Sequence, residues 1–524
     1  MKKFSRLSFL LISFLFLLPQ INFGQGMSAQ QIDSLVQKTM NTFNVPGMAV
    51  AVLKDGKVLH MKGYGTRSID KNGKVDENTL FGVASNTKAM TAAALAILID
   101  QGKLEWDTKV TNVIPEFKLY DPYVTREFTV RDLLTHRSGL GLGAGDLMVW
   151  PAANTTTTAE LIHNLRYLKP VSSFRSKYDY DNLLYIVAGV VVERVSGVDF
   201  DTFIAENIFK PLAMESSVVN WNLIEDKTNV IDGHAPTNGK LVTVGLSFTK
   251  AADPAAGVYS SVKDMSKWVQ MQLNNGKYGQ TLQDSIFSRK QHREMWTPQT
   301  LIRTGPGDYN TQFRAYGLGW NLSDVNGNKE VAHTGGLLGI VSQVTMIPQL
   351  DLGIIVLTNQ QSGEAFRSVT NTIKDSYFGI KGKDRIKQYN ENRLRNEKYS
   401  DSVVAEVWKN VEKVQKNGKT NTAVLSNYTG TYSDPWFGKV NIFMKNGTLR
   451  FEAEKAPDLH GEMSFYKGNT FVIKWDDRSL NGDAFSIFSL DREGKSKGFG
   501  MEPVSPMTDF SFNFHDLEFV KEQE

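Results

Sequence analysis

The sequence predicts an α+β fold, in which helices cover the faces of an antiparallel sheet, followed by a small all-β barrel. Two apolar runs near the N-terminus, 48–53 and 58–63, flank a turn signal at 54–56 and predict a hairpin. Residues 316–358 form a second group of expected strands, and helical periodicity recurs between the two groups. Because strands lie at both ends of this region, we expect them to join in one sheet.

The elements within this region follow from the spacing of apolar residues. Four segments have helical spacing, and the third is apolar nearly all round, which is typical of a buried helix. These helices are expected at 31–43, 158–167, 182–196 and 262–274. Strands are expected at 316–322, 341–347 and 353–359.

The composition of the chain changes after residue 380. Residues 381–421 are charged and polar, and valines at near-helical spacing predict a linker helix there. Residues 422–524 contain short alternating segments separated by turn residues, which predict a small β-barrel of about eight strands with an aromatic core. The clearest expected strands are 439–444, 448–453, 470–475, 484–490 and 510–514.

Residues 1–25 have the pattern of a secretory signal peptide. Lys2, Lys3 and Arg6 precede an apolar stretch that ends at Pro19 and is too short to span a bilayer. An uncleaved anchor is the alternative. With cleavage, we expect a bacterial protein that is periplasmic or secreted, without stable membrane insertion.

Charge and cysteine content exclude several functions. The net charge of +3 comes from the three basic residues of the signal, so a nucleic-acid partner is not expected. The chain has no cysteine, which excludes disulfides, a thiol nucleophile and a cysteine-linked lipid anchor. The histidines show no metal-binding spacing, so we expect no metal and no cofactor.

The most informative motif is Ser85-Asn86-Thr87-Lys88, at the start of an alanine-rich apolar helix. Three-residue spacing on a helix places the serine hydroxyl and the lysine amine on one face. The amine can then take the hydroxyl proton and make the serine a nucleophile. The same spacing occurs elsewhere in the chain, but only Ser85 begins an otherwise apolar helix. A capping serine with a solvated lysine is the alternative.

Tyr180 and Asn182 form a second motif, just ahead of the expected buried helix. The phenol can relay a proton and the amide can hold a substrate carbonyl. A neighbouring lysinium is expected to make the phenolate of Tyr180 more accessible. The alternative is a loop in which the tyrosine only packs.

The third motif is His333-Thr334-Gly335-Gly336. Glycines on a sheet-edge strand let a substrate backbone lie close and pair with the strand. A backbone amide at this place can also stabilise an oxyanion. A glycine-rich turn with one polar histidine is the alternative.

Together, and in this order, the motifs resemble those of the serine β-lactamase and penicillin-binding protein superfamily. The similar branch holds class C β-lactamases, D,D-peptidases, D-aminopeptidases and related esterases, which share S-x-x-K, Y-x-N and K-T-G or H-T-G motifs. The resemblance covers roughly residues 28–380 and implies a catalytic domain, 26–380, with an all-helical subdomain beside the sheet. The C-terminal part, 422–524, resembles a lipocalin-like domain found in many bacterial members.

The resemblance also assigns roles to the motif residues. Ser85 would be the acylated nucleophile, while Lys88 and Tyr180 would share the base and acid work. Asn182 would bind the amide of the acyl group. The remaining substrate contacts would come from His333, Thr334 and Gly335, and the oxyanion hole from the backbone amides of Ser85 and Gly336.

The predicted function is therefore that of a serine hydrolase, which cleaves amide or ester bonds of small molecules or short peptides through an acyl-serine. Many β-lactamases have a lysine where His333 stands, and a histidine is mostly neutral at pH 7. This favours a peptidase acting on D-amino-acid peptides, or an esterase, with weak β-lactam hydrolysis at most. A catalytically silent ligand-binding or assembly module is the alternative. A rim of the barrel that borders the cleft and limits substrate size is a second hypothesis, beside a purely structural aromatic core.

Overall fold

The computed structural model describes residues 25–246, 248–305, 307–416 and 422–523. The predicted signal peptide lies outside the described residues, apart from Gln25. Within the described part, no helix combines the length and the apolar character that a membrane span needs.

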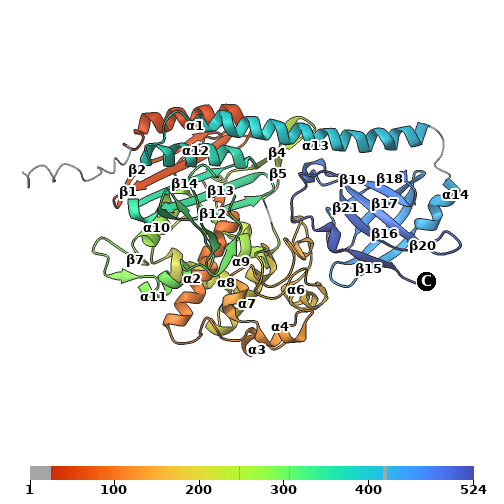
Figure 1. Ribbon diagram of the computed structural model, residues 1–524, viewed down its shortest axis with the longest axis horizontal. Helices are drawn as coiled ribbons and strands as arrows, with labels where there is room; N and C mark the ends of the chain where they lie inside the picture. The colour runs from red at the N-terminus through yellow and green to blue at the C-terminus, as the bar shows by residue number, and fades with distance from the viewer. Residues whose placement is uncertain (1–24, 247, 306, 417–421, 524) are drawn as a thin grey trace, which may run out of the picture.

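One antiparallel sheet of eight strands forms the centre of the N-terminal domain, for which we predicted a catalytic role, in the order β2-β1-β14-β13-β12-β11-β10-β9 (Figure 1). The N-terminal hairpin pairs with the last strand of the domain, so that Val50 lies opposite Val356. The prediction that both ends of the domain share one sheet is confirmed. The strands are β1 (Gly47–Lys54), β2 (Lys57–Gly65), β9 (Thr300–Ile302), β10 (Arg314–Tyr316), β11 (Asn321–Val325), β12 (Asn328–Leu337), β13 (Ile340–Ile347) and β14 (Leu352–Thr358).

Helices cover both faces of this sheet, as predicted. Helices α1 (Ala29–Phe43) and α12 (Gly363–Tyr377) lie on one face, and α10 (Val262–Leu273) contacts β1 and β14 on the other (Figure 1). Strand β1 is buried on both sides: Val50 belongs to the core beneath α1 and α12, and Ala51 belongs to the second core. Because successive strand residues point to opposite faces, an apolar run at β1 is expected.

A subdomain of short helices packs beside the sheet around one buried helix, α7 (Leu183–Ser196). Residues 183–192 of α7 are all buried, which explains why the segment is apolar on every side. The other helices are α2 (Thr87–Asp100), α3 (Val110–Val113), α4 (Pro122–Glu127), α5 (Val130–Leu133), α6 (Thr158–Asn164), α8 (Phe200–Ile204), α9 (Asp253–Ala256) and α11 (Arg289–Met295). Short two-stranded pieces link them: β3 (Phe81–Gly82) with β6 (Tyr259–Ser260), β4 (Gly233–Thr237) with β5 (Lys240–Val244), and β7 (Lys277–Tyr278) with β8 (Asp284–Ser285).

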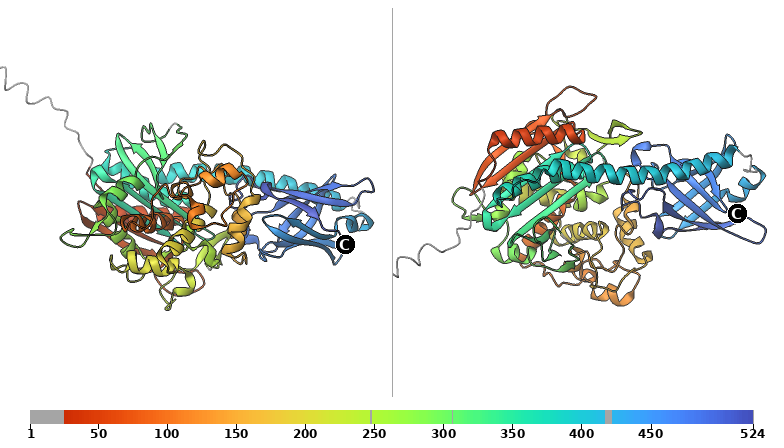
Figure 2. Two further views of the ribbon diagram at one scale, coloured as in Figure 1. Left: turned by 90° about the horizontal axis from the view of Figure 1, so that it is seen from below. Right: turned by 45° about the horizontal axis from the view of Figure 1, so that its top comes forward.

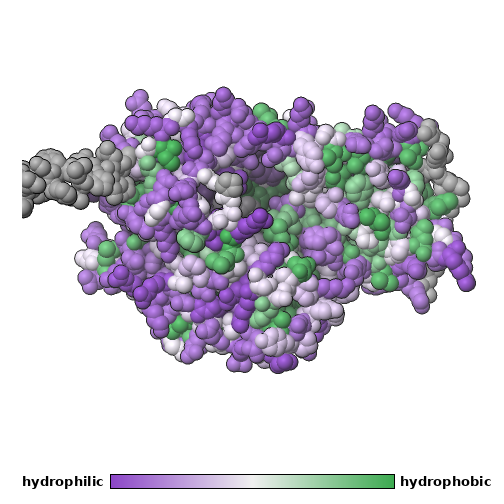
Figure 3. All heavy atoms as spheres, viewed as in Figure 1, coloured by the Kyte–Doolittle hydropathy of each residue, from purple (hydrophilic) through white to green (hydrophobic). Residues whose placement is uncertain are grey.

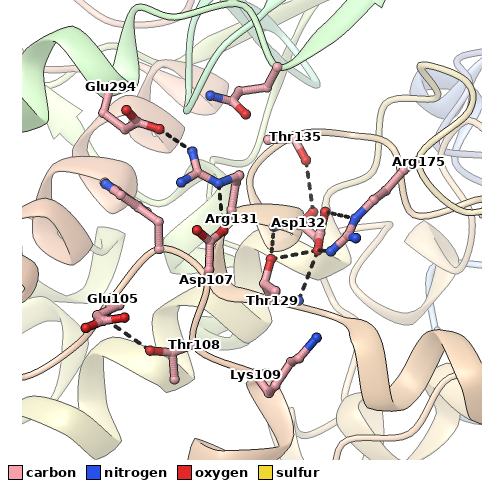
Figure 4. Close-up of polar contacts among 12 residues, drawn as sticks. Glu105, Asp107, Thr108, Lys109, Thr129, Arg131, Asp132, Thr135, Arg175 and Glu294 are labelled. Atoms are coloured by element: carbon pink, nitrogen blue, oxygen red, sulfur yellow. Dashed lines mark hydrogen bonds and ion pairs between the residues drawn. The ribbon is translucent and has the colours of Figure 1, made fainter.

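A buried carboxylate, Asp132, holds the segment around α5 in place (Figure 4). Asp132 forms a capping box with Thr129 at the start of α5 and accepts hydrogen bonds from Arg137 and Arg175. Burial opposes the charge, but the bonds from Arg175 and Thr129 keep the pKa of Asp132 below its usual value. The turn that contains His136, one residue before Arg137, is thereby fixed.

The C-terminal part consists of a long helix and a barrel. Helix α13 (Arg385–Lys416) is about 48 Å long at 1.5 Å per residue and runs from the catalytic domain to the barrel (Figures 1 and 2). The short helix α14 (Thr422–Leu425) leads into the barrel. Eight antiparallel strands close the barrel: β15 (Gly430–Asp434), β16 (Gly438–Lys445), β17 (Thr448–Ala453), β18 (His460–Lys467), β19 (Thr470–Trp475), β20 (Ala484–Leu490), β21 (Ser496–Pro503) and β22 (Glu518–Lys521).

The barrel docks on the helical subdomain. The backbone N–H of Thr155 donates to the carbonyl of Lys455, and the Asn164 side chain donates to the carbonyl of Trp436. One predicted strand is wrong, because 510–514 belongs to the connection between β21 and β22. Its alternating phenylalanines pack against the core and the catalytic domain, not within a ladder, and the strand pattern alone could not separate the two.

Candidate active site

Ser85 lies in a strained turn at the entry to α2. Ala84 has a positive φ of 49°, which is costly for a residue with a side chain, and a single 3-10 turn then leads into the helix. Ser85 itself stays partly exposed, while its neighbours on both sides are buried. The turn therefore presents the hydroxyl at the surface of an otherwise buried element.

Lys88 is fully buried one turn further along, and its amine has three polar neighbours. Its Nζ lies 3.0 Å from Ser85 Oγ, 2.7 Å from Asn182 Oδ1 and 3.0 Å from the carbonyl oxygen of Ala255. The two carbonyl-type oxygens can only accept hydrogen bonds, whereas the Ser85 hydroxyl can donate one. A neutral amine with two N–H bonds and one lone pair therefore fits these contacts with the lone pair toward Ser85.

The charge state of Lys88 agrees with that geometry. Burial lowers its pKa to about 7, against the opposing pull of Asp146 and Asp181. Near neutral pH a large fraction of the amine is therefore free to accept a proton.

The turn at 317–320 packs against the backbone of α2. Gly319 has a φ of +79°, and a Cβ there would approach Ala89 Cα to 2.8 Å. The expected continuous strand 316–322 is thus wrong: β10 ends at Tyr316 and β11 begins at Asn321. The glycine turn lets the chain approach the Lys88 backbone closely.

Tyr180 packs against the amine of Lys88 and the ring of His136. The Lys88 amine lies 4.9 Å from the centre of the Tyr180 ring, and the centres of the Tyr180 and His136 rings are 4.2 Å apart. Burial raises the pKa of Tyr180 well above its usual value, although a hydrogen bond with Ser85 partly offsets this. The expectation of an accessible phenolate is therefore wrong, because desolvation is the largest influence on the pKa of this phenol. A protonated phenol suits the role of proton donor.

Asn182 connects Lys88 to a carboxyl group, Asp146, that the sequence analysis did not identify. The Asn182 side-chain amide donates to Asp146 Oδ2 at 2.8 Å, and Asp146 is fully buried. Burial and the charge of Asp181 raise the pKa of Asp146 to about 8. A signal existed in the sequence: Asp146 is the only charged residue in the glycine-rich apolar stretch 139–150.

The third motif lies on β12 beside the Ser85 turn. Pairing of β12 with β11 ends at Ala332, so residues 333–337 pair only with β13 and present a free edge. A Cβ on Gly335 would lie 2.2 Å from the carbonyl oxygen of Val83, so a glycine is needed for this close approach. Thr334 and Gly336 are exposed on this edge.

His333 points away from this edge into the protein. Its Nε2 lies 2.8 Å from the Tyr316 hydroxyl and its Nδ1 lies 2.6 Å from the Thr334 carbonyl oxygen. Burial, reinforced by Lys88, lowers the pKa of His333 to about 3. The imidazole is therefore neutral, with N–H on Nδ1 and both nitrogens already in hydrogen bonds.

The structure thus brings Ser85, Lys88, Tyr180 and Asn182 together, with the β12 edge beside them. In the residues that the structure describes, no cluster of three or more potential ligands suits a metal ion.

Comparison with known families agrees with this arrangement. Residues 32–377 match the family described as beta-lactamase. The chain belongs to the beta-lactamase family. Residues 414–521 match a second family, described as a domain of unknown function, DUF3471. The fold is that of the beta-lactamase-like serine hydrolases, followed in the chain by a separate eight-stranded barrel.

Several named proteins are similar to this member of the beta-lactamase family. An unguisins hydrolase of Aspergillus campestris is 28% identical over 63% of this chain and 61% of its own length. Protein flp of Staphylococcus aureus is 28% identical over 64% of each chain. The chain therefore spans about three fifths of the length of these relatives.

Two solved structures share the fold. The octameric penicillin-binding protein homologue from Pyrococcus abyssi aligns over 94% of this chain and 100% of its own, with a TM-score of 0.60 and 21% identity. A class C beta-lactamase mutant aligns over 66% of this chain and 96% of its own, with a TM-score of 0.55 and 21% identity.

Proposed function

We propose that this protein cleaves amide or ester bonds through an acyl-enzyme formed on Ser85. The observation that carries the proposal is the 3.0 Å contact between Ser85 Oγ and the buried amine of Lys88. The amine's lone pair takes the hydroxyl proton as the oxygen attacks the substrate carbonyl. Lys88 is then an ammonium, held by the carbonyl-type oxygens of Asn182 and Ala255.

The tetrahedral intermediate carries its charge on the former carbonyl oxygen. In the proposal, this oxyanion accepts hydrogen bonds from the backbone amides of Ser85 and Gly336, on the helix entry and the free edge of β12. When the bond to the leaving amine or alcohol breaks, the leaving group takes a proton from the Tyr180 phenol. The ammonium of Lys88 then returns a proton to the phenoxide. Water next attacks the acyl-serine by the same route, which releases the acid and restores Ser85.

The β12 edge and Asn182 supply the proposed substrate contacts. The Asn182 amide would hold the acyl group's carbonyl, while Thr334 and Gly335 would border the rest of the substrate. A short peptide can pair with the unpaired edge at 333–337 as an added strand. This edge favours a short peptide, and the resemblance to D,D-peptidases, D-aminopeptidases and esterases leads us to propose peptides that contain D-amino acids, or small esters, as substrates. The names of two relatives, both unguisins hydrolases, support a hydrolase but name no substrate for this chain.

Efficient β-lactam hydrolysis is disfavoured by His333. Its ring is neutral, and both nitrogens are bonded inside the protein, so it offers no positive charge for a drug carboxylate. We propose slow β-lactam turnover at most.

Intact mass after incubation with a fluorophosphonate tests the proposal. In that reaction a bond forms between Ser85 Oγ and phosphorus, fluoride leaves, and Lys88 takes the proton. The wild type should gain one adduct, and Ser85→Ala should gain none. A wild type that stays unlabelled would favour the alternative of a silent binding module.

A periplasmic or secreted location is a further proposal, supported by the basic residues Lys2, Lys3 and Arg6 ahead of the apolar stretch. Fractionation of a bacterium that expresses the full sequence should place the protein outside the cytoplasm, shortened near residue 25.

A further inference from the structure

A loop of the C-terminal barrel reaches the proposed active site. The loop, residues 509–513, lies between β21 and β22 and contacts the segment 143–150 and Tyr180. In the space-filling view, the surface is hollowed where the two folded parts meet, and apolar residues line part of this hollow (Figure 3). The barrel is therefore part of the surroundings of the catalytic residues.

The loop packs closely against the catalytic domain. The ring of Phe510 meets the ring of Tyr180 edge-on, with the centres 5.9 Å apart. A Cβ on Gly143 would lie 2.7 Å from the Phe510 carbonyl oxygen, so the glycine permits this approach. Asn513 is fully buried and accepts a hydrogen bond from the backbone N–H of Leu147 at 3.3 Å.

Ser511 makes the contact that leads to the chemistry. Its hydroxyl donates to Asp146 Oδ2 at 2.9 Å, and the same oxygen accepts from the Asn182 amide at 2.8 Å. Asn182 in turn accepts from Lys88 at 2.7 Å, and Lys88 lies 3.0 Å from Ser85 Oγ. One unbroken series of hydrogen bonds thus runs from the barrel to the nucleophile.

The direction of each bond in this series is fixed by chemistry. Oδ2 of Asp146 accepts from both Ser511 and Asn182, so the NH₂ group of Asn182 faces it and the amide oxygen faces Lys88. If the amide turned over, its NH₂ group would face the amine of Lys88 and its oxygen would face the accepting oxygen of Asp146. Asp146 therefore orients Asn182, and the bond from Ser511 restricts where the Asp146 carboxylate can turn.

We propose that Ser511 is a positioning residue that the barrel supplies to the hydrolase site, acting through Asp146 on Asn182 and Lys88. This inference rests on the proposed function, because it concerns the activation of Ser85. It assigns the barrel a part in the chemistry of the catalytic domain, and not only in its architecture.

The charges near Asp146 make the inference measurable by pH. Lys88 on α2 and Asp181 ahead of α7 are the charged groups that act on Asp146, and the protonated Tyr180 lies beside them. The Ser511 hydroxyl favours the ionised carboxylate. Without it Asp146 holds its proton more tightly, which removes negative charge near Lys88 and lowers the pKa of the amine. On a plot of the Ser85 labelling rate against pH, the fall at low pH (the acidic limb) should then move to lower pH.

The test measures the rate at which a fluorophosphonate labels Ser85 in the full chain, between pH 5 and pH 9. Ser511→Ala should lower the plateau rate by roughly five- to tenfold, the value of one ordinary hydrogen bond. It should also move the acidic limb only slightly downward, because Asp146, with a pKa of about 8, is already mostly protonated there. Ser511→Thr keeps the hydroxyl and should restore both. Ser489→Ala, which removes a hydroxyl on β20 that bonds within the barrel, is the matched control and should behave as wild type.

A double-mutant cycle tests the route through Asp146. Asp146→Ala should slow labelling, and Ser511→Ala should add almost nothing in that background, because coupled residues are non-additive. Additive losses would overturn the route. A Ser511→Ala protein that labels like wild type, with an unmoved limb, would overturn the inference alone. A wild type that never labels would overturn the proposed function and this inference with it.

Discussion

The floor and the roof of the active site are built from different parts of the molecule. The floor, formed by Ser85, Lys88 and Asn182, comes from one domain, and its amine is buried within a fixed set of hydrogen bonds. The roof, formed by Phe510 and Ser511, comes from the barrel, and Phe510 keeps 40% of its surface exposed. A dry, rigid floor is what proton transfer requires, while a partly exposed roof can border substrates of different size. We therefore expect changes to the floor to abolish the chemistry and changes to the roof to tune it.

Loss of the nucleophile should have the largest effect. Ser85→Ala removes the attacking oxygen, so turnover of any ester or amide should fall by at least about 10⁴-fold. Ser85 is partly exposed, so the melting temperature should stay within about 2 °C of wild type. Residual turnover close to wild type would place the nucleophile elsewhere.

Removal of the base, Lys88, should have the second-largest effect. Lys88→Met keeps the apolar stem and loses the amine, so kcat/KM should fall by about 10³-fold, as is typical of a general base. Lys263→Met is the matched control, because Ser260 and Lys263 have the same spacing but Lys263 is exposed and bonds to Asn78. Equal losses in the two variants would show that Lys88 has no special role.

The pH dependence of wild-type turnover should report the protonation of Lys88. Below the Lys88 pKa of about 7 the amine is protonated and has no lone pair. Turnover should therefore fall about tenfold for each pH unit below that point and level off above it. Protonation of His333 cannot produce this limb, because burial lowers its pKa to about 3. A limb near pH 10 would mean that Lys88 is an ordinary lysine.

A change in the roof should have the smallest effect and a different character. Phe510→Ala removes the ring that meets Tyr180 edge-on, so bulky acyl groups should gain relative to acetyl by about tenfold in kcat/KM. Phe437→Ala is not a suitable control because that ring is buried; Val520→Ala, exposed on β22, is the matched change. Equal selectivity in wild type and Phe510→Ala would remove Phe510 from the substrate's surroundings.

This difference between floor and roof also separates what the sequence predicts from what it does not. Ser85 and Lys88 lie three residues apart on one helix, so their contact follows from helix geometry alone. The sheet, the buried helix α7 and the barrel likewise follow from periodicity. The position of Ser511 depends on how two domains dock, which no local pattern records, and the alternation at 510–514 is the same for a strand and for this loop. The protonation state of the Tyr180 phenol could not be predicted from the sequence either, because its desolvation depends on residues that several segments pack around it.

Titration of Lys88 in the intact protein is the most direct measurement of the proposed chemistry. NMR of lysine labelled at Cε, with the Lys88 signal assigned by its loss in Lys88→Met, follows the amine without any substrate. The structure leads us to expect a midpoint at about pH 7. A midpoint at the ordinary lysine value of 10.5 would leave Ser85 without a base at neutral pH and would rule out the mechanism.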